Sequence, residues 1–157
     1  MGQEFGQFQE WSEARELDWF LLAEPEHQQL QAYVKELLAL YKKYPALYAN
    51  DDNQEGFEWI NADDAARSIF SFVRKSPTGR NNLLFVINYT PVAREDYRVG
   101  VAEKKQYKLI LNSKDPRFGG DTPVEQTVYK AVKKECDGRD FSFAYPLPAY
   151  GVAVFLY

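Results

Sequence analysis

The hydrophobic pattern changes from a helical to a strand period near residue 50, and this change constrains the fold more than any other feature. Pro25 suits a first helical position, and Tyr44 should end the helix because a residue before proline avoids helical geometry. We predict one amphipathic helix between them, and its apolar face must pack on something. Apolar residues recur there at helical spacing, at Leu30, Tyr33, Val34, Leu37, Leu38 and Tyr41.

Short strands are predicted after the polar, turn-rich stretch 50–56. Asp137-Gly138 is a typical hairpin turn between two of them, and the continuous apolar run 83–89 is typical of a central strand. The predicted strands cover residues 69–74, 83–89, 107–111, 128–135, 140–145 and 152–156. Six to eight strands at this spacing indicate a mainly β fold, an antiparallel β-sandwich. We expect it to follow the helix and an irregular segment, residues 1–24, with at most one helical turn.

The composition excludes several classes of partner. The formal net charge is −4, and residues 1–26 hold seven acidic side chains and one Arg, which would repel nucleic acid and anionic membranes. No apolar run has the length of a membrane span, so we predict no nucleic-acid and no membrane partner. Cys136 is the only cysteine and the first fifteen residues lack a signal pattern, so we expect a cytoplasmic protein.

Aromatic residues are unusually frequent, at 16% of the chain. Two explanations remain open. Strands favour Tyr, Phe and Trp, so a β-rich fold alone would account for them. Alternatively, part of the surplus lies on a surface where sugar rings stack.

The sequence offers few groups for catalysis or metal binding. His27 is the only histidine, and Cys136 has neither a second cysteine nor a histidine near it in the sequence. Zinc sites and nucleophilic triads would therefore lack their usual partners. We predict no catalytic residue, no metal ligand and no cofactor.

Five short motifs resemble segments of bacterial glycogen branching enzymes, which belong to the α-amylase superfamily. The first is Met1 to Trp11, completed by Leu17-Asp18-Trp19. The others, in the same order as in that family, are Phe57-Glu58-Trp59-Ile60-Asn61, Asn88-Tyr89-Thr90-Pro91-Val92 with Tyr97 to Val101, Phe118-Gly119-Gly120, and Leu147-Pro148-Ala149. Phe20 departs from the pattern, since the family commonly has His there.

The resemblance implies a division of the chain and a function. Residues 1–48 would be a remnant of the end of a catalytic (β/α)8 barrel, and residues 49–157 a C-terminal all-β domain. The parent enzyme would be a retaining transglycosylase that moves α-1,4-glucan chains to α-1,6 positions in glycogen. Its catalytic carboxylates would lie ahead of this chain, which would be inactive alone. The expected partners are an α-glucan and the missing catalytic barrel.

The resemblance also indicates three candidate substrate-binding residues, Glu4, Trp11 and Trp19. Glu4 would lie near the rim of the barrel, either as a hydrogen-bonded loop carboxylate or as one edge of the glucan cleft. Each Trp would either anchor its loop or stack on a sugar ring. Trp59, at the start of a strand, is expected in the core.

Two other functions remain open. The chain could be a stand-alone polysaccharide-binding β-sandwich module, or the terminal domain of another superfamily member such as an amylase or a debranching enzyme. Glu10-Trp11 with Leu17-Asp18-Trp19 favours the branching enzymes.

Overall fold

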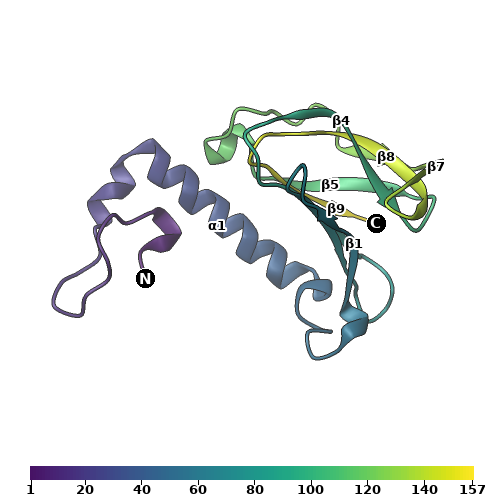
Figure 1. The fold of residues 1–157 in the computed structure, drawn as a ribbon. Coiled ribbons are helices and arrows are strands. Elements are labelled where there is room, and N and C mark those ends of the chain that lie inside the picture. The colour runs from purple at the N-terminus through teal and green to yellow at the C-terminus, as the bar shows by residue number, and fades with distance from the viewer. The chain divides into compact units, whose positions relative to one another are not determined.

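A computed structural model describes all residues, 1–157, and divides into two compact units (Figure 1). The N-terminal unit comprises Met1–Lys43 and Lys114–Pro123. The β unit comprises Tyr44–Ser113 and Val124–Tyr157. The division between a barrel remnant and a C-terminal domain at residues 48 and 49 stays a prediction.

The N-terminal unit contains the expected helix. Helix α1 spans Pro25–Lys43, which confirms both predicted ends. The preceding segment holds two short 3₁₀ helices, η1 (Gln3–Phe5) and η2 (Trp19–Ala23), so the prediction of at most one helical turn was wrong. A third 3₁₀ helix, η5 (Pro116–Phe118), lies against α1, with the rings of Phe118 and Tyr33 5.2 Å apart.

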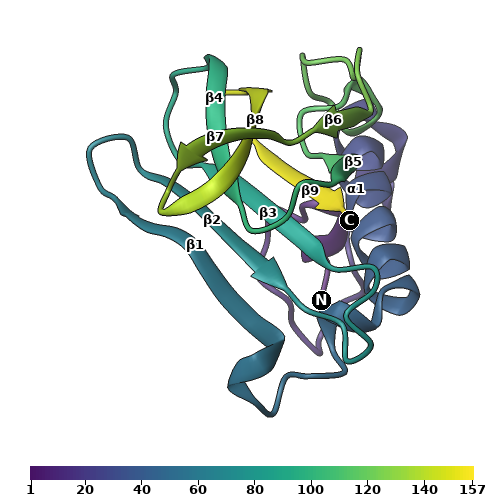
Figure 2. The same cartoon turned by 90° about the vertical axis from the view of Figure 1, so that its right-hand side faces the viewer.

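The β unit contains nine strands in two antiparallel sheets, which confirms the predicted sandwich (Figure 2). The larger sheet has six strands in the order β1-β2-β3-β9-β5-β6 and the smaller has the order β4-β8-β7. Two 3₁₀ helices, η3 (Pro45–Leu47) and η4 (Gln54–Gly56), precede the first strand. The strands are β1 (Phe57–Asp64), β2 (Ile69–Arg74), β3 (Leu83–Asn88), β4 (Arg94–Val101), β5 (Gln106–Asn112), β6 (Val128–Lys130), β7 (Val132–Cys136), β8 (Arg139–Leu147) and β9 (Val152–Leu156).

One predicted strand is two strands in the structure. We expected a single strand over 128–135, but the chain changes sheets at the buried Ala131. Strand β6 pairs with β5 in the larger sheet, whereas β7 pairs with β8 in the smaller. This split, together with strands β1 and β4, raises the number of strands above the six to eight that were expected.

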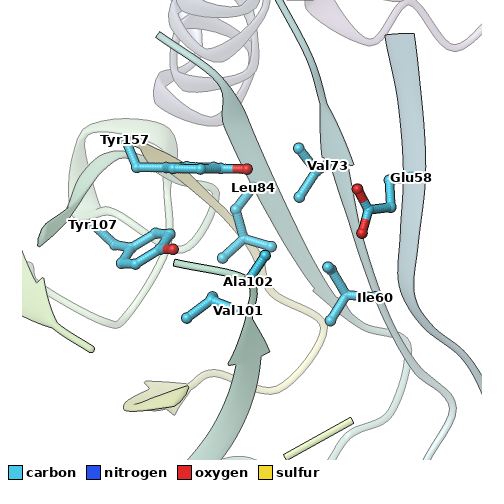
Figure 3. A pocket seen from close by; sticks show the side chains of 8 residues that line it. All are labelled: Glu58, Ile60, Val73, Leu84, Val101, Ala102, Tyr107 and Tyr157. Carbon is cyan, nitrogen blue, oxygen red and sulfur yellow. The ribbon is translucent and has the colours of Figure 1, made fainter. Parts of the chain in front are cut away.

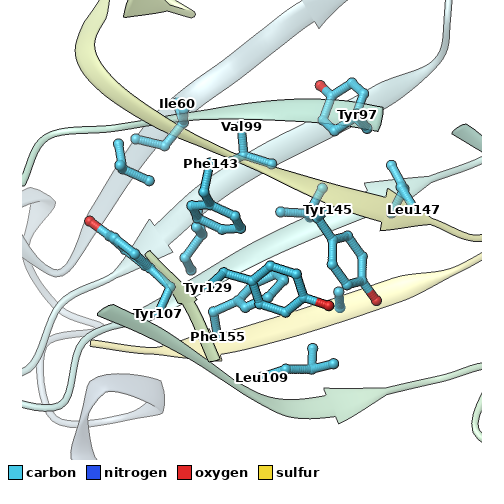
Figure 4. Close-up of a cluster of buried hydrophobic side chains, with 14 of the residues drawn as sticks. Ile60, Tyr97, Val99, Tyr107, Leu109, Tyr129, Phe143, Tyr145, Leu147 and Phe155 are labelled. Atoms are coloured by element: carbon cyan, nitrogen blue, oxygen red, sulfur yellow. The ribbon is translucent and has the colours of Figure 1, made fainter. Parts of the chain in front are cut away.

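The core lies between the two sheets and is rich in aromatic rings (Figure 4). Phe143 of β8 stacks on Tyr107 of β5 at 5.0 Å, and its other ring neighbours include Phe155 of β9 at 5.2 Å. Tyr145 meets Phe155 edge to face at 5.1 Å, and Tyr129 does the same at 5.6 Å. Such edge and offset contacts stabilise a core beyond the area that they bury. Strands therefore hold much of the aromatic surplus.

Asn88 holds three segments of the β unit together at the end of β3. Its side chain is buried, and its amide donates to the carbonyl oxygens of Val92 and Pro148, each at 2.9 Å. Its Oδ1 accepts from the backbone N–H of Thr90 at 3.0 Å and from the Thr90 hydroxyl at 2.7 Å. Asn88 and Thr90 thus satisfy backbone groups where the strand ends.

The Asp137-Gly138 turn joins β7 to β8 as predicted, with φ of 52° and 67°. Such left-handed pairs give hairpins a twist that matches the strands. The Asp137 carboxylate accepts from the Gly100 N–H at 2.9 Å and from the Asn61 side chain at 2.8 Å. A Cβ on Gly100 would lie 2.2 Å from the Cys136 carbonyl oxygen, so this turn requires glycine on the facing strand.

Trp59 is not in the core, and this expectation was wrong. Its side chain is 49% exposed, whereas its neighbour Ile60 belongs to the core. Successive side chains of a strand point to opposite faces, so the place of Ile60 directs Trp59 to the outer face of the larger sheet.

Candidate functional site

The first seven residues fold into a closed loop that positions the candidate site. Gly2 and Gly6 both adopt left-handed φ, 87° and 74°, which glycine adopts without strain. The Gln7 N–H donates back to the Gly2 carbonyl oxygen at 2.9 Å. Phe5, between the glycines, is fully buried, so the loop carries its own apolar anchor.

Trp11 lines an open hollow on this loop. The hollow has a volume of about 480 Å³ and is formed by the segment from Met1 to Trp11. Trp11 is 47% exposed and Phe8 is 81% exposed, so both aromatic rings are accessible. The lining residues are Met1, Gln3, Gln7, Phe8, Gln9, Glu10 and Trp11. Flat apolar rings beside amide donors and acceptors are the groups with which proteins bind sugars.

Glu4 does not line this hollow. It is exposed in the first turn of η1, between the two glycines. The carboxylate that does line the hollow is that of Glu10.

Trp19 has an anchoring contact. It begins η2 and stacks on the buried Phe5, with ring centroids 5.2 Å apart and 28° between the planes. The preceding Asp18 N–H donates to the Gln7 Oε1 at 2.9 Å, which ties the same segment to the loop. Half of the Trp19 side chain remains exposed.

The structure therefore does not gather the three predicted residues into one pocket. Trp11 lines the hollow, Glu4 is exposed and does not line it, and Trp19 packs on Phe5. Glutamines at positions 3, 7 and 9 and Phe8 were not predicted as site residues. Their recurrence beside Trp11 in the sequence is the signal that could have indicated them.

A second cavity lies inside the β unit, between Glu58 and Tyr157 (Figure 3). Its volume is about 10 Å³, which is near the minimum that holds one water molecule. Glu58 at its edge forms an ion pair with Arg139 at 2.6 Å and a second ion pair with Lys75. The cavity is too small for a substrate.

Cys136 has the properties of a structural thiol. Burial and the neighbouring Asp137 raise the pKa of Cys136 to about 11. Only a thiolate is an effective nucleophile, so this side chain is unreactive near neutral pH.

No group of three or more His, Cys, Asp and Glu side chains is arranged to hold a metal ion. The helices of the structure include none with the length and apolar character needed to cross a membrane.

Comparison with known proteins places this chain. Residues 59–157 match the family model described as alpha amylase, C-terminal all-beta domain. The whole chain is 48% identical to the 1,4-alpha-glucan branching enzyme GlgB of Butyrivibrio fibrisolvens, over 25% of that relative. The enzyme of the same name from Marinobacter nauticus is 41% identical over 98% of this chain and 25% of its own length. That from Aquifex aeolicus is 40% identical over 97% of this chain and 24% of its own length. The chain thus spans about a quarter of the length of these curated relatives. The nine-stranded sandwich and the family match together show that the chain belongs to the family of α-amylase C-terminal all-β domains.

Proposed function

We propose that this chain is the C-terminal part of a 1,4-α-glucan branching enzyme of glycogen biosynthesis, and that it supports the catalytic barrel without catalysing the reaction itself. The observation that carries the proposal is the 48% identity to a branching enzyme over the full 157 residues. That identity includes residues 1–58, which precede the matched all-β domain. Both units therefore support the same assignment.

The proposal assigns the chemistry to residues ahead of this chain. Retaining transfer needs a nucleophilic carboxylate and an acid/base carboxylate about 5 Å apart across the glycosidic bond. Glu10 is the one carboxylate that lines the hollow beside Trp11, so this hollow does not supply such a pair. We place the enzyme in the cytoplasm, because its single cysteine, Cys136, allows no internal disulfide in this chain.

Replacing the matching quarter of the Butyrivibrio fibrisolvens enzyme with this chain tests the proposal. We call the product the hybrid enzyme. It should lower the iodine absorbance of amylose. The isolated chain should not, nor should the Butyrivibrio fibrisolvens enzyme from which the matching quarter has been removed. A folded hybrid without activity, or an isolated chain as active as the hybrid, would overturn the assignment.

A second role, contact with glucan at the N-terminal unit, is favoured by the hollow beside Trp11. In this proposal Trp11 stacks on a glucose ring and the amides of Gln3 and Gln9 bond to hydroxyl groups. The Gln7 amide, which is bonded to the Asp18 N–H and the Gln9 carbonyl oxygen, shapes the loop together with Trp19 and Glu4. Gel retardation by glycogen tests it. Trp11→Ala should weaken the retardation, whereas Tyr150→Ala, which removes an exposed aromatic ring of the β unit, should leave it unchanged.

A further inference from the structure

The outer face of β1, β2 and β3 carries a continuous cluster of six aromatic rings. We call it the aromatic face, and it consists of Phe57, Trp59, Phe70, Phe72, Phe85 and Tyr89. Trp59 and Tyr89 are 49% and 62% exposed, and the other four are partly exposed.

Strand register produces this cluster. Trp59 of β1 lies opposite Phe72 of β2, and Phe72 lies opposite Phe85 of β3. The Phe72 and Phe85 rings are stacked at 4.8 Å with only 9° between their planes. Directly opposite residues in neighbouring strands share a face, so three strands present one aromatic row.

The same three strands are apolar on their other face as well. Ile60, Val73 and Leu84 alternate with the aromatic residues and belong to the sandwich core. An antiparallel sheet with one wet face shows alternation of polar and apolar residues, whereas strands covered on both faces do not. The pattern of β1 to β3 is therefore that of strands covered on both sides, and large exposed apolar patches mark interaction sites.

The rings themselves indicate what kind of partner covers them. Phe72 has Phe57 stacked at 5.3 Å and Phe85 stacked at 4.8 Å, so its flat faces already contact other rings. A pyranose needs an open ring face and hydrogen-bonding groups beside it. Arg74, the cation at the end of β2, is bonded to Asp51 and to the Ala46 carbonyl oxygen. The aromatic face is thus suited to an apolar protein surface more than to a sugar.

We propose that the aromatic face is the docking surface for the catalytic part of the branching enzyme, through an apolar protein surface of that part. This inference depends on the proposed function. The relatives are about four times as long as this chain, so three quarters of such an enzyme lies outside the structure and is the available occupant. Docking through this face covers rings that otherwise remain in water.

Radical footprinting of the hybrid enzyme and of the isolated chain tests the docking surface. Oxidation of Trp59 and Tyr89 should be severalfold slower in the hybrid, while acetylation of Lys133 and Lys134 on exposed β7 should proceed at the same rate in both. Equal oxidation rates of Trp59 in an active hybrid would overturn the inference and leave the proposed function standing. An inactive hybrid would count against the proposed function, and the Trp59 rate would still decide the docking surface.

Two other occupants have distinct outcomes. Protection of Trp59 in the isolated chain that grows with protein concentration would identify a second copy as the occupant and overturn the inference. Protection that requires added glycogen would identify glucan and overturn it as well.

A matched pair of variants gives an independent measurement. Trp59 and Val132 are 49% and 50% exposed, on β1 and β7. Trp59→Gln should lower the Tm of the hybrid more than that of the isolated chain, because only the hybrid loses the docking contact. Val132→Gln should change both alike. The same shift from Trp59→Gln in the two proteins would contradict docking at this face.

Discussion

Replacing Asn88 should strongly destabilise the β unit. The buried side chain donates to two backbone carbonyl oxygens and accepts from the Thr90 N–H, so Asn88→Ala removes three hydrogen bonds to the backbone and one to a hydroxyl. Each bond contributes about 1 kcal/mol net, and each buried group left without a partner costs about 1–3 kcal/mol. We expect Asn88→Ala to lower the free energy of unfolding by about 3–5 kcal/mol, a large part of the ~5–15 kcal/mol typical of a domain.

Asn88→Asp separates the hydrogen-bond explanation from loss of volume. The carboxylate has the same shape, but it cannot donate to the Val92 and Pro148 carbonyl oxygens, and a buried charge then faces two oxygens. At pH 7 it should therefore destabilise at least as much as Asn88→Ala.

Urea denaturation followed by circular dichroism measures both variants against a control. Asn53→Ala is the control, because the exposed Asn53 side chain accepts a single bond in a turn, from the Glu55 N–H at 2.9 Å. Loss of such a cap should cost about 1 kcal/mol or less. If Asn88→Ala cost no more than Asn53→Ala, or if Asn88→Asp were well tolerated, the hydrogen bonds at the end of β3 would not be what stabilises this part of the β unit.

Three further results are expected. Gly100→Ala should lower the free energy of unfolding by about 3 kcal/mol or more, because the new Cβ would overlap the Cys136 carbonyl oxygen. Gly79→Ala, where φ is 68° and the surrounding space is open, should cost only about 1 kcal/mol. Equal urea midpoints for the two variants would contradict this. Burial raises the pKa of Cys136 from 9.0 to about 11, so the rate of disulfide exchange with a dithiobenzoate reagent should rise toward a midpoint near pH 11. The stability that this thiol contributes should be complete below pH 9 and be lost as the pH rises toward 11. An exchange midpoint near pH 9 in the folded protein would refute the shift. Trp19→Ala should lower the Tm of the chain through loss of the stack on Phe5 while changing glycogen retardation less than Trp11→Ala does, and the opposite ranking would exchange the two roles.

The elements that could be predicted from the sequence depend on local chemistry. Pro25 and Pro45 set the ends of α1, and Asp137-Gly138 set the turn between β7 and β8, because proline and left-handed residues act within a few positions of the chain. The β-sandwich class followed from the number of short strands and turns. Each of these features is decided by residues that are neighbours in the sequence.

The features that were missed depend on contacts between distant segments. Alternation shows which residues of β1 share a face, but not which face meets the core when both are apolar, so the side of Trp59 could not be read. The exchange of sheets at Ala131 is decided by its burial in the core, and a single small residue gives no pattern. In the candidate site, Trp11 was proposed from a motif, and its role stays a prediction. The motif did not indicate that Glu4 would not line the hollow beside Trp11, because the lining depends on how the loop between Gly2 and Gly6 closes.

The position of β9 has a consequence for how the sandwich is assembled. This strand lies between β3 and β5, so it joins segments that precede it by about seventy and about forty-five positions. Until Val152–Leu156 has left the ribosome, β3 and β5 each present an unpaired edge, and unpaired edges recruit other chains. Distant pairings of this kind also slow folding. A newly made chain thus passes through an interval in which its two half-sheets are vulnerable to aggregation, and chaperone protection would matter most in that interval.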